Sequence, residues 1–198
     1  MALPEDELMI IRTLLLLMLA LAQVQCLAAT PLLENTYFRR SGNQWGYWVQ
    51  RHLKVYFSEK AELVQLPLLF TDAFQQWNAG IDSLFSYEVV QNPEQADIIV
   101  RIDTQSMCTS PNSAATFSVH KPKTHQLDHV IIQVGWFTDP ANYQMCILHE
   151  VGHAFGLYGH SNSAEDAMWP TLQKTVLSER DLRTIHYLYF AQESAQKL

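Results

Sequence analysis

The stretch HEVGHAFGLYGH, residues 149–160, is the part of the sequence that determines the predicted fold. His149 and His153 are four residues apart, so on a helix their side chains lie on one face, one turn apart. Two imidazoles at this spacing can bind one Zn²⁺ ion. Gly156 is expected to end the helix, because glycine readily takes the left-handed conformation that a helix stop uses. The chain can then turn and bring His160 back as a third nitrogen ligand.

Glu150 follows the first histidine directly, so its carboxylate is predicted beside the metal rather than on it. There it can take a proton from a water molecule that the metal activates. Three protein ligands leave a fourth position open to water, which is typical of a catalytic zinc and not of a structural one. A bare HExxH pattern also occurs by chance, but the glycine, the third histidine and Met168-Trp169-Pro170 downstream favour a real site.

The size and charge of the chain restrict the classes of protein that it can belong to. Its 198 residues suit one domain with its own hydrophobic core. The net charge of −7 and the pI near 5.5 argue against a nucleic-acid partner, because nucleic-acid-binding proteins present a basic surface.

The N-terminal segment contains an apolar run, TLLLLMLALA, over residues 13–22. The run is short for a membrane span and has the length of a signal-peptide core. Residues 1–8 are acidic, which is atypical for a signal peptide, and translation from Met9 would place MIIR ahead of the run. We therefore predict a signal peptide over residues 1–28, a folded domain over residues 29–198 and an exported protein, secreted or extracytoplasmic. The alternative is an uncleaved N-terminal membrane anchor.

Two cysteines, Cys108 and Cys146, remain after the predicted cleavage. An exported protein can join them in a disulfide, which would tie the loop around Cys108 to the active-site helix. The alternative is a pair of buried thiols.

A second group of histidines comprises His120, His125 and His129, with Asp128 beside them. They cluster around the turn between the last two predicted strands. A second, structural metal there is one interpretation, and exposed loop histidines without a metal are the commoner one.

Hydrophobic periodicity predicts a mixed α/β domain with one twisted sheet. The predicted strands cover residues 53–58, 85–90, 97–103, 114–120 and 129–136, and residues 104–113 are expected to form a loop. A helix is expected over about residues 61–79, and its start stays open because Pro67 must lie in its first turn. Its buried stripe is formed by Leu66, Phe70, Ala73, Phe74 and Trp77. The active-site helix should begin at Asp139-Pro140 and reach about Phe155, and residues 178–181 (SERD) start the last helix as a capping box.

The segment from His149 to His160, followed by Met168, resembles the metzincin zinc peptidases, and most closely the small bacterial, secreted proteases of the matrixin type. The resemblance extends over most of the predicted folded domain, including residues 94–98 (EQADI) and residues 177–181 (LSERD). It implies an α+β metzincin-like fold with a twisted, mostly parallel, five-stranded sheet, an active-site helix and a C-terminal helix. It also implies one catalytic Zn²⁺ held by the three histidines, and a turn methionine, Met168, that packs beneath the metal.

One departure from the family pattern concerns the third ligand. The family places two residues between the glycine and the third histidine, whereas this chain has three, residues 157–159. Strict register would put Gly159 at the ligand position, and glycine has no side chain to bind a metal. We assign His160, because the insertion falls in a loop and the eight-residue step from His160 to Met168 fits the family. Glu165 or Asp166 is the fallback ligand.

The resemblance implies a metalloendopeptidase that hydrolyses internal peptide bonds of extended substrates, with Glu150 as general base. The expected partner is a protein or peptide substrate, and we expect a monomer. Two alternatives have other functions: a secreted zinc-binding module on a protease scaffold without general proteolytic activity, and a zinc hydrolase that acts on a non-peptide amide. The intact Glu150 argues against the first, because a site that only binds zinc does not need that carboxylate.

Overall fold

The computed structural model describes residues 36–37, 45–107, 114–121, 124–137 and 139–191. The predicted signal peptide over residues 1–28 and Cys108 of the predicted disulfide lie outside the described residues. Residues 36–198 form a compact unit. Within the described residues, no helix combines the length and the apolar character needed to cross a membrane.

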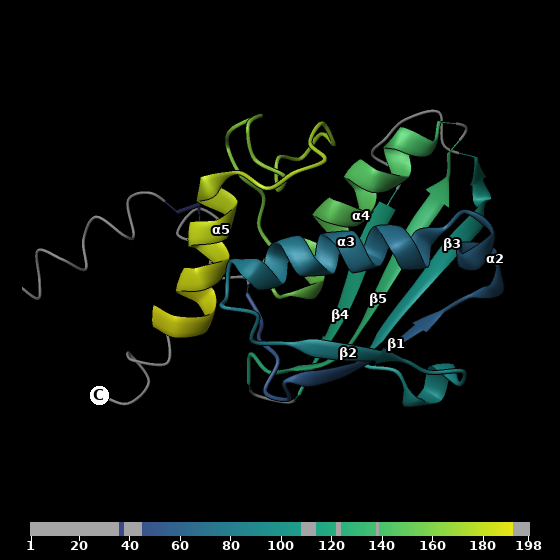
Figure 1. Ribbon diagram of the computed structural model, residues 1–198, viewed down its shortest axis with the longest axis horizontal. Coiled ribbons are helices and arrows are strands. Elements are labelled where there is room, and N and C mark those ends of the chain that lie inside the picture. The colour runs from purple at the N-terminus through teal and green to yellow at the C-terminus, as the bar shows by residue number, and fades with distance from the viewer. Residues whose placement is uncertain (1–35, 38–44, 108–113, 122–123, 138, 192–198) are drawn as a thin grey trace, which may run out of the picture. The chain divides into compact units, whose positions relative to one another are not determined.

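One sheet forms the centre of this unit (Figure 1). Its strands lie in the order β2-β1-β3-β5-β4. The bounds are β1 (His52–Phe57), β2 (Ser86–Val89), β3 (Ile98–Met107), β4 (Ala114–His120) and β5 (Leu127–Trp136). Each of β2, β1, β3 and β5 pairs in parallel with its neighbours in that group, whereas β4 pairs antiparallel with β5 and forms one edge. The expected α+β fold around a parallel sheet is therefore confirmed.

β3 lies in the centre of the sheet, between β1 and β5. Its alternate residues Ile98, Val100 and Ile102 are buried and Arg101 is exposed, so one face of the strand lies in the core. The strand continues to Met107, so the prediction of a loop from residue 104 was wrong for its first four residues. The pairing with β5 is interrupted after Asp103 and resumes at Met107, which pairs with Trp136.

The segment of the predicted helix is divided into α2 (Glu59–Leu63) and α3 (Leu66–Ala79), and the expected position of Pro67 in a first turn is confirmed for α3. Gln65 takes a left-handed conformation between them, with φ 59°. Pro67 explains the break, because it has no N–H to donate to the carbonyl four residues earlier and its ring would clash there. In the first turn of α3 the same residue is tolerated.

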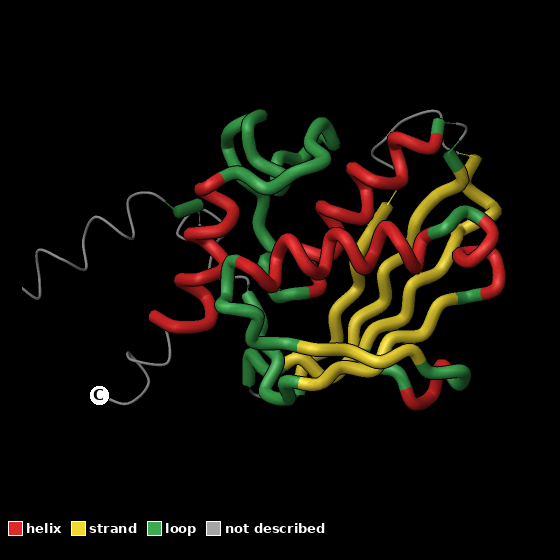
Figure 2. Tube along the Cα trace, in the orientation of Figure 1, coloured by secondary structure: helices red, strands yellow, loops and turns green. Residues whose placement is uncertain are grey.

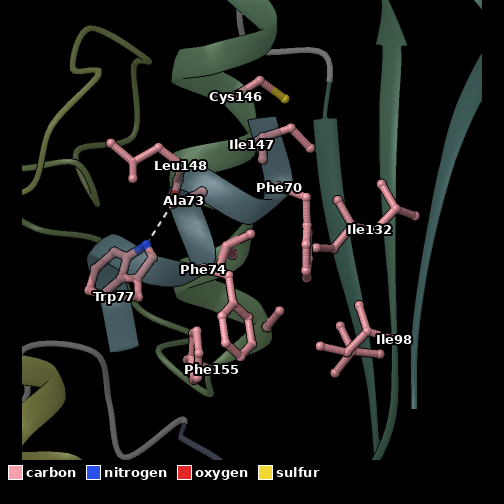
Figure 3. Close-up of a cluster of buried hydrophobic side chains, with 14 of the residues drawn as sticks. Phe70, Ala73, Phe74, Trp77, Ile98, Ile132, Cys146, Ile147, Leu148 and Phe155 are labelled. Carbon is pink, nitrogen blue, oxygen red and sulfur yellow. Dashed lines mark hydrogen bonds between the residues drawn. The ribbon is translucent and has the colours of Figure 1, made fainter. Parts of the chain in front are cut away.

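Helices α3 and α4 (Pro140–Ala154) cover the sheet and pack against each other (Figures 1 and 2). The predicted stripe on α3 is buried, and its Phe70 ring lies on the side of the helix that faces Ile132 of the sheet (Figure 3). The Trp77 indole also donates a hydrogen bond to the Leu148 carbonyl, at 2.8 Å, which joins α3 to α4. Helix α5 (Glu179–His186) follows the loop after α4 and continues into a π-helical turn over Tyr187–Ala191.

Candidate metal centre

Helix α4 begins where the sequence predicts. The Asp139 side chain accepts a hydrogen bond from the Ala141 N–H, and Pro140 occupies the first turn. The helix ends at Ala154, and Gly156 follows with φ 102°, a conformation that favours glycine. A Cβ at this position would also lie 1.9 Å from the carbonyl oxygen of Gly46, so no other residue fits there without movement.

Two distant segments donate hydrogen bonds to the carbonyls of the last residue of α4 and of the two residues after it. The Trp48 indole donates to the Ala154 carbonyl at 2.9 Å, and the Tyr189 hydroxyl donates to the Phe155 carbonyl at 2.9 Å. The Gly46 N–H donates to the Gly156 carbonyl at 3.0 Å. The end of the helix is therefore fixed by the segment before β1 and by the C-terminal turn.

The structure brings the three predicted histidines together. One potential ligand atom from each of His149, His153 and His160 lies within 4.8 Å of the others. The ring centroids are 4.7 to 5.2 Å apart. His149 is buried and His160 is exposed, so the group has one side in the core and one side open to solvent.

Backbone carbonyls orient the two helical histidines. Nδ1 of His149 lies 2.7 Å from the Ala167 carbonyl oxygen, and Nδ1 of His153 contacts that of Leu157. A carbonyl oxygen only accepts hydrogen bonds, so each Nδ1 carries the proton and each Nε2 keeps a free lone pair. Burial lowers the pKa of His149 to about 4 and of His153 to about 3, and it also lowers that of His160. The imidazoles are therefore neutral near pH 7, which is the form that binds a metal.

Glu150 lies beside this group and is nearly inaccessible to solvent. Burial raises its pKa to about 7, and a hydrogen bond from the Thr116 hydroxyl acts in the opposite direction. That hydroxyl is 2.6 Å from Oε2 of the carboxylate. A carboxylate with a pKa near 7 can both accept and return a proton at neutral pH, which is what general acid–base chemistry requires.

Met168 is completely buried against helix α4. A Cβ added at Gly152 would lie 2.5 Å from the Met168 sulfur and 2.6 Å from the Trp77 ring, so α4 needs glycine here in order to approach both. The buried Asp181 fixes the turn that contains Ala167 and Met168, because one of its carboxylate oxygens accepts a hydrogen bond from the Ala167 N–H at 2.8 Å. The other accepts the Tyr37 hydroxyl at 2.9 Å.

The fallback ligands lie elsewhere. Asp166 accepts hydrogen bonds from Arg180, Ser161 and Ser178. Burial acts to raise the pKa of its carboxyl group, but these three donors outweigh it and hold the pKa below the usual range. Glu165 is exposed and paired with Lys174 at 2.7 Å. Neither belongs to the histidine group.

Among the described side chains, the histidines of the second group do not come together as a possible metal site. His125 stacks on Trp45, with ring centroids 4.0 Å apart, and contacts the Trp45 carbonyl. His129 pairs with Asp128 at 3.7 Å. The side chain of His120 lies outside the described part of the chain. Over the described residues, His149, His153 and His160 are the one group that meets the geometry of a metal site.

Comparison with protein families gives a match over most of the chain. A family model described as Matrixin, a family of peptidases, matches residues 47–190. A search of curated proteins found no match. The matched region contains the whole sheet, the three histidines and helix α5.

The close approach at Gly152 predicts the effect of Gly152→Ala. The added methyl group must displace Met168 or Trp77, which should lower the free energy of unfolding by about 1–3 kcal/mol. Metal affinity should fall as well, because the Met168 turn carries the Ala167 carbonyl that orients His149. Urea unfolding and metal titration against a competing chelator measure the two effects. Gly80→Ala is the control, since its Cβ would lie 2.8 Å from Ile185 and none of its close neighbours belongs to the histidine group. Equal metal affinities for the two variants would show that the contact between Gly152 and Met168 does not support the metal site.

The histidine pKa values predict a stability loss of the metal-free protein in acid. The lowered pKa values mean that the unfolded chain binds protons below pH 6.5 that His149 and His153 in the folded chain do not. Glu150 partly offsets this, because its raised pKa makes the folded chain hold a proton between pH 4.5 and 7 that the unfolded chain has released. The free energy of unfolding should therefore fall from pH 6.5 to 4.5, by about 1.4 kcal/mol per pH unit for each net proton.

Urea unfolding in EDTA over this pH range is the measurement. Glu150→Gln provides the control, because it removes the offset and should make the fall steeper over the same range. A wild-type stability that does not change from pH 6.5 to 4.5, or a Glu150→Gln profile parallel to wild type, would contradict the assignment.

Proposed function

The chain belongs to the matrixin family of metallopeptidases, and from this premise we propose that it is a zinc-dependent endopeptidase that cleaves extended protein or peptide substrates. The observation that supports this most strongly is the meeting of three neutral histidines with the buried carboxylate of Glu150. A site that only holds zinc has no use for a carboxylate whose pKa lies near 7 beside its ligands.

His149, His153 and His160 would hold the metal through their ring nitrogens. Their chemistry fits zinc, which prefers neutral imidazole nitrogen and, with three protein ligands, keeps one position for water. For His149 and His153 the available atom is Nε2, because Nδ1 is used by a backbone carbonyl. Bound there, zinc supplies a Lewis acid that polarises the substrate carbonyl and lowers the pKa of a water molecule.

Glu150 is the proposed general base. Its carboxylate takes a proton from the attacking water and passes it to the leaving amine. Its position next to His149 on α4 places it beside the proposed ligands, and its burial excludes bulk water that would compete for the proton.

The edge strand β4 is the proposed site of substrate binding. β4 pairs with β5 on one side and is last in the sheet order, so its other side can accept an extended peptide as an added strand. Thr116 of this strand contacts Glu150, which places the edge next to the proposed general base. Export by the segment over residues 1–28 and action as a monomer remain part of the proposal.

The assignment of His160 as third ligand is tested by His160→Ala. We expect wild type to hold one zinc ion and to cleave casein, and His160→Ala to lose both, because two histidines leave the metal weakly held. Zinc content by atomic absorption and release of soluble peptides from casein are the measurements. His52→Ala, in an exposed position on β1, is the control and should retain both properties. A His160→Ala variant that holds zinc and cleaves casein would show that the ligand set is different.

Glu150→Gln tests the proposed general base. The variant should keep its zinc, since Glu150 is not among the proposed ligands, and should lose about 10²–10⁴-fold in kcat. Zinc content and casein cleavage are again the measurements. Full activity of the variant would exclude Glu150 from the mechanism, and a wild type that holds zinc but cleaves nothing would favour a zinc-binding module.

A further inference from the structure

A hydroxyl group on the edge strand contacts Glu150 twice. The Thr116 Oγ1 atom lies 2.6 Å from the Glu150 carboxylate oxygen Oε2 and 3.2 Å from the main-chain carbonyl oxygen of the same residue. No other side chain among the described residues forms a hydrogen bond with this carboxylate. The two contacts bring together two elements that are 34 residues apart in the sequence.

The position of this hydroxyl is restricted by its surroundings. Thr116 lies within β4 and pairs with Ile132 of β5, so its backbone is fixed by the sheet. Threonine is branched at Cβ and has few allowed χ1 rotamers in a strand. The hydroxyl is therefore in place before any ligand binds.

A hydrogen-bond donor at this position fixes the orientation of the Glu150 carboxylate. Rotation of a glutamate carboxylate about its last bond is broad, and a general base must have its oxygen aimed at the reacting water. A donor 2.6 Å from Oε2 occupies that oxygen and leaves Oε1 for the proton transfer.

We propose that Thr116 is a positioning residue that holds the Glu150 carboxylate by its hydroxyl, so that the strand which receives the substrate also orients the general base. The inference rests on the proposed function. It concerns the orientation of the carboxylate, and the role proposed for the Thr116 hydroxyl is exerted through Glu150.

The test compares Thr116→Val, which keeps the branched shape and loses the hydroxyl, with Thr116→Ser, which keeps the hydroxyl. A hydrogen bond to a charged group contributes enough to predict about a tenfold loss of kcat for Thr116→Val. KM and zinc content should stay within about twofold of wild type, and Thr116→Ser should recover most of kcat. Labelled casein is the substrate. Thr71→Val on α3 is the matched control, because it also removes a hydroxyl that makes hydrogen bonds, at a site remote from Glu150.

A second measurement does not depend on turnover. Acetohydroxamic acid binds zinc through two oxygens, and a neighbouring carboxylate can take up its proton. Its affinity for the cobalt-substituted protein, followed by visible absorption, should fall about five- to tenfold in Thr116→Val and stay near wild type in Thr116→Ser.

The outcomes separate the two proposals. A wild type that binds acetohydroxamic acid but leaves casein intact contradicts the endopeptidase proposal, while the affinities of the two variants still decide the role of Thr116. Thr116→Val with wild-type kcat and affinity overturns the positioning role. Thr116→Ser as impaired as Thr116→Val also overturns it, since packing and not the hydroxyl would then matter. A wild type that holds no zinc overturns both proposals.

Discussion

The two hydrogen bonds from histidine Nδ1 atoms to backbone carbonyls are the interactions on which the rest of the site depends. An imidazole whose Nδ1–H is held at a fixed carbonyl has one tautomer and one ring orientation, so its Nε2 points in a defined direction. The carbonyl acceptors belong to Ala167 and Leu157, which lie outside the helix that carries the histidines. The arrangement of the two helical histidines is therefore as rigid as the two loops that supply these carbonyls.

Distant parts of the chain fix each loop. Ala167 is held by the buried carboxylate of Asp181, which also accepts the N–H of Ser178 at the start of α5 and the hydroxyl of Tyr37. Leu157 forms a β-bridge with Trp45, next to the hydrogen bond between Gly46 and Gly156. The segment before β1 thus fixes the loop at Leu157, and the first turn of α5 fixes the loop at Ala167. Their contribution to the site is to orient the ligands, although neither supplies one.

The sequence was sufficient for those features that depend on local spacing. The i, i+4 histidines, Asp139 as N-cap and Gly156 as helix stop each follow from the conformation of a single element, and the structure contains all three features of α4. The position of Pro67 in the first turn of α3 follows from the sequence, whereas the separate helix α2 and the left-handed Gln65 were missed because the apolar period continues across the break. Trp48, Tyr189 and Thr116 were missed for a different reason. Their partners are far away in the sequence, and no periodic pattern reports which carbonyl or carboxylate a distant side chain will meet.

The additional residue before His160 fits between two anchored points. On one side Leu157 is fixed by its bridge to Trp45, and on the other the Ser161 N–H donates to the Met168 carbonyl at 2.7 Å. Only residues 158–160 lie between these anchors, and a short segment with fixed ends can take up one residue more by bulging outwards, since neither anchor has to move. The exposed position of His160 agrees with this reading, whereas the two histidines of α4 could not tolerate an insertion, because one more residue would rotate them off their common face. In this chain the departure from the family spacing therefore falls where the backbone can adjust, and the helical histidines keep the spacing that the helix requires.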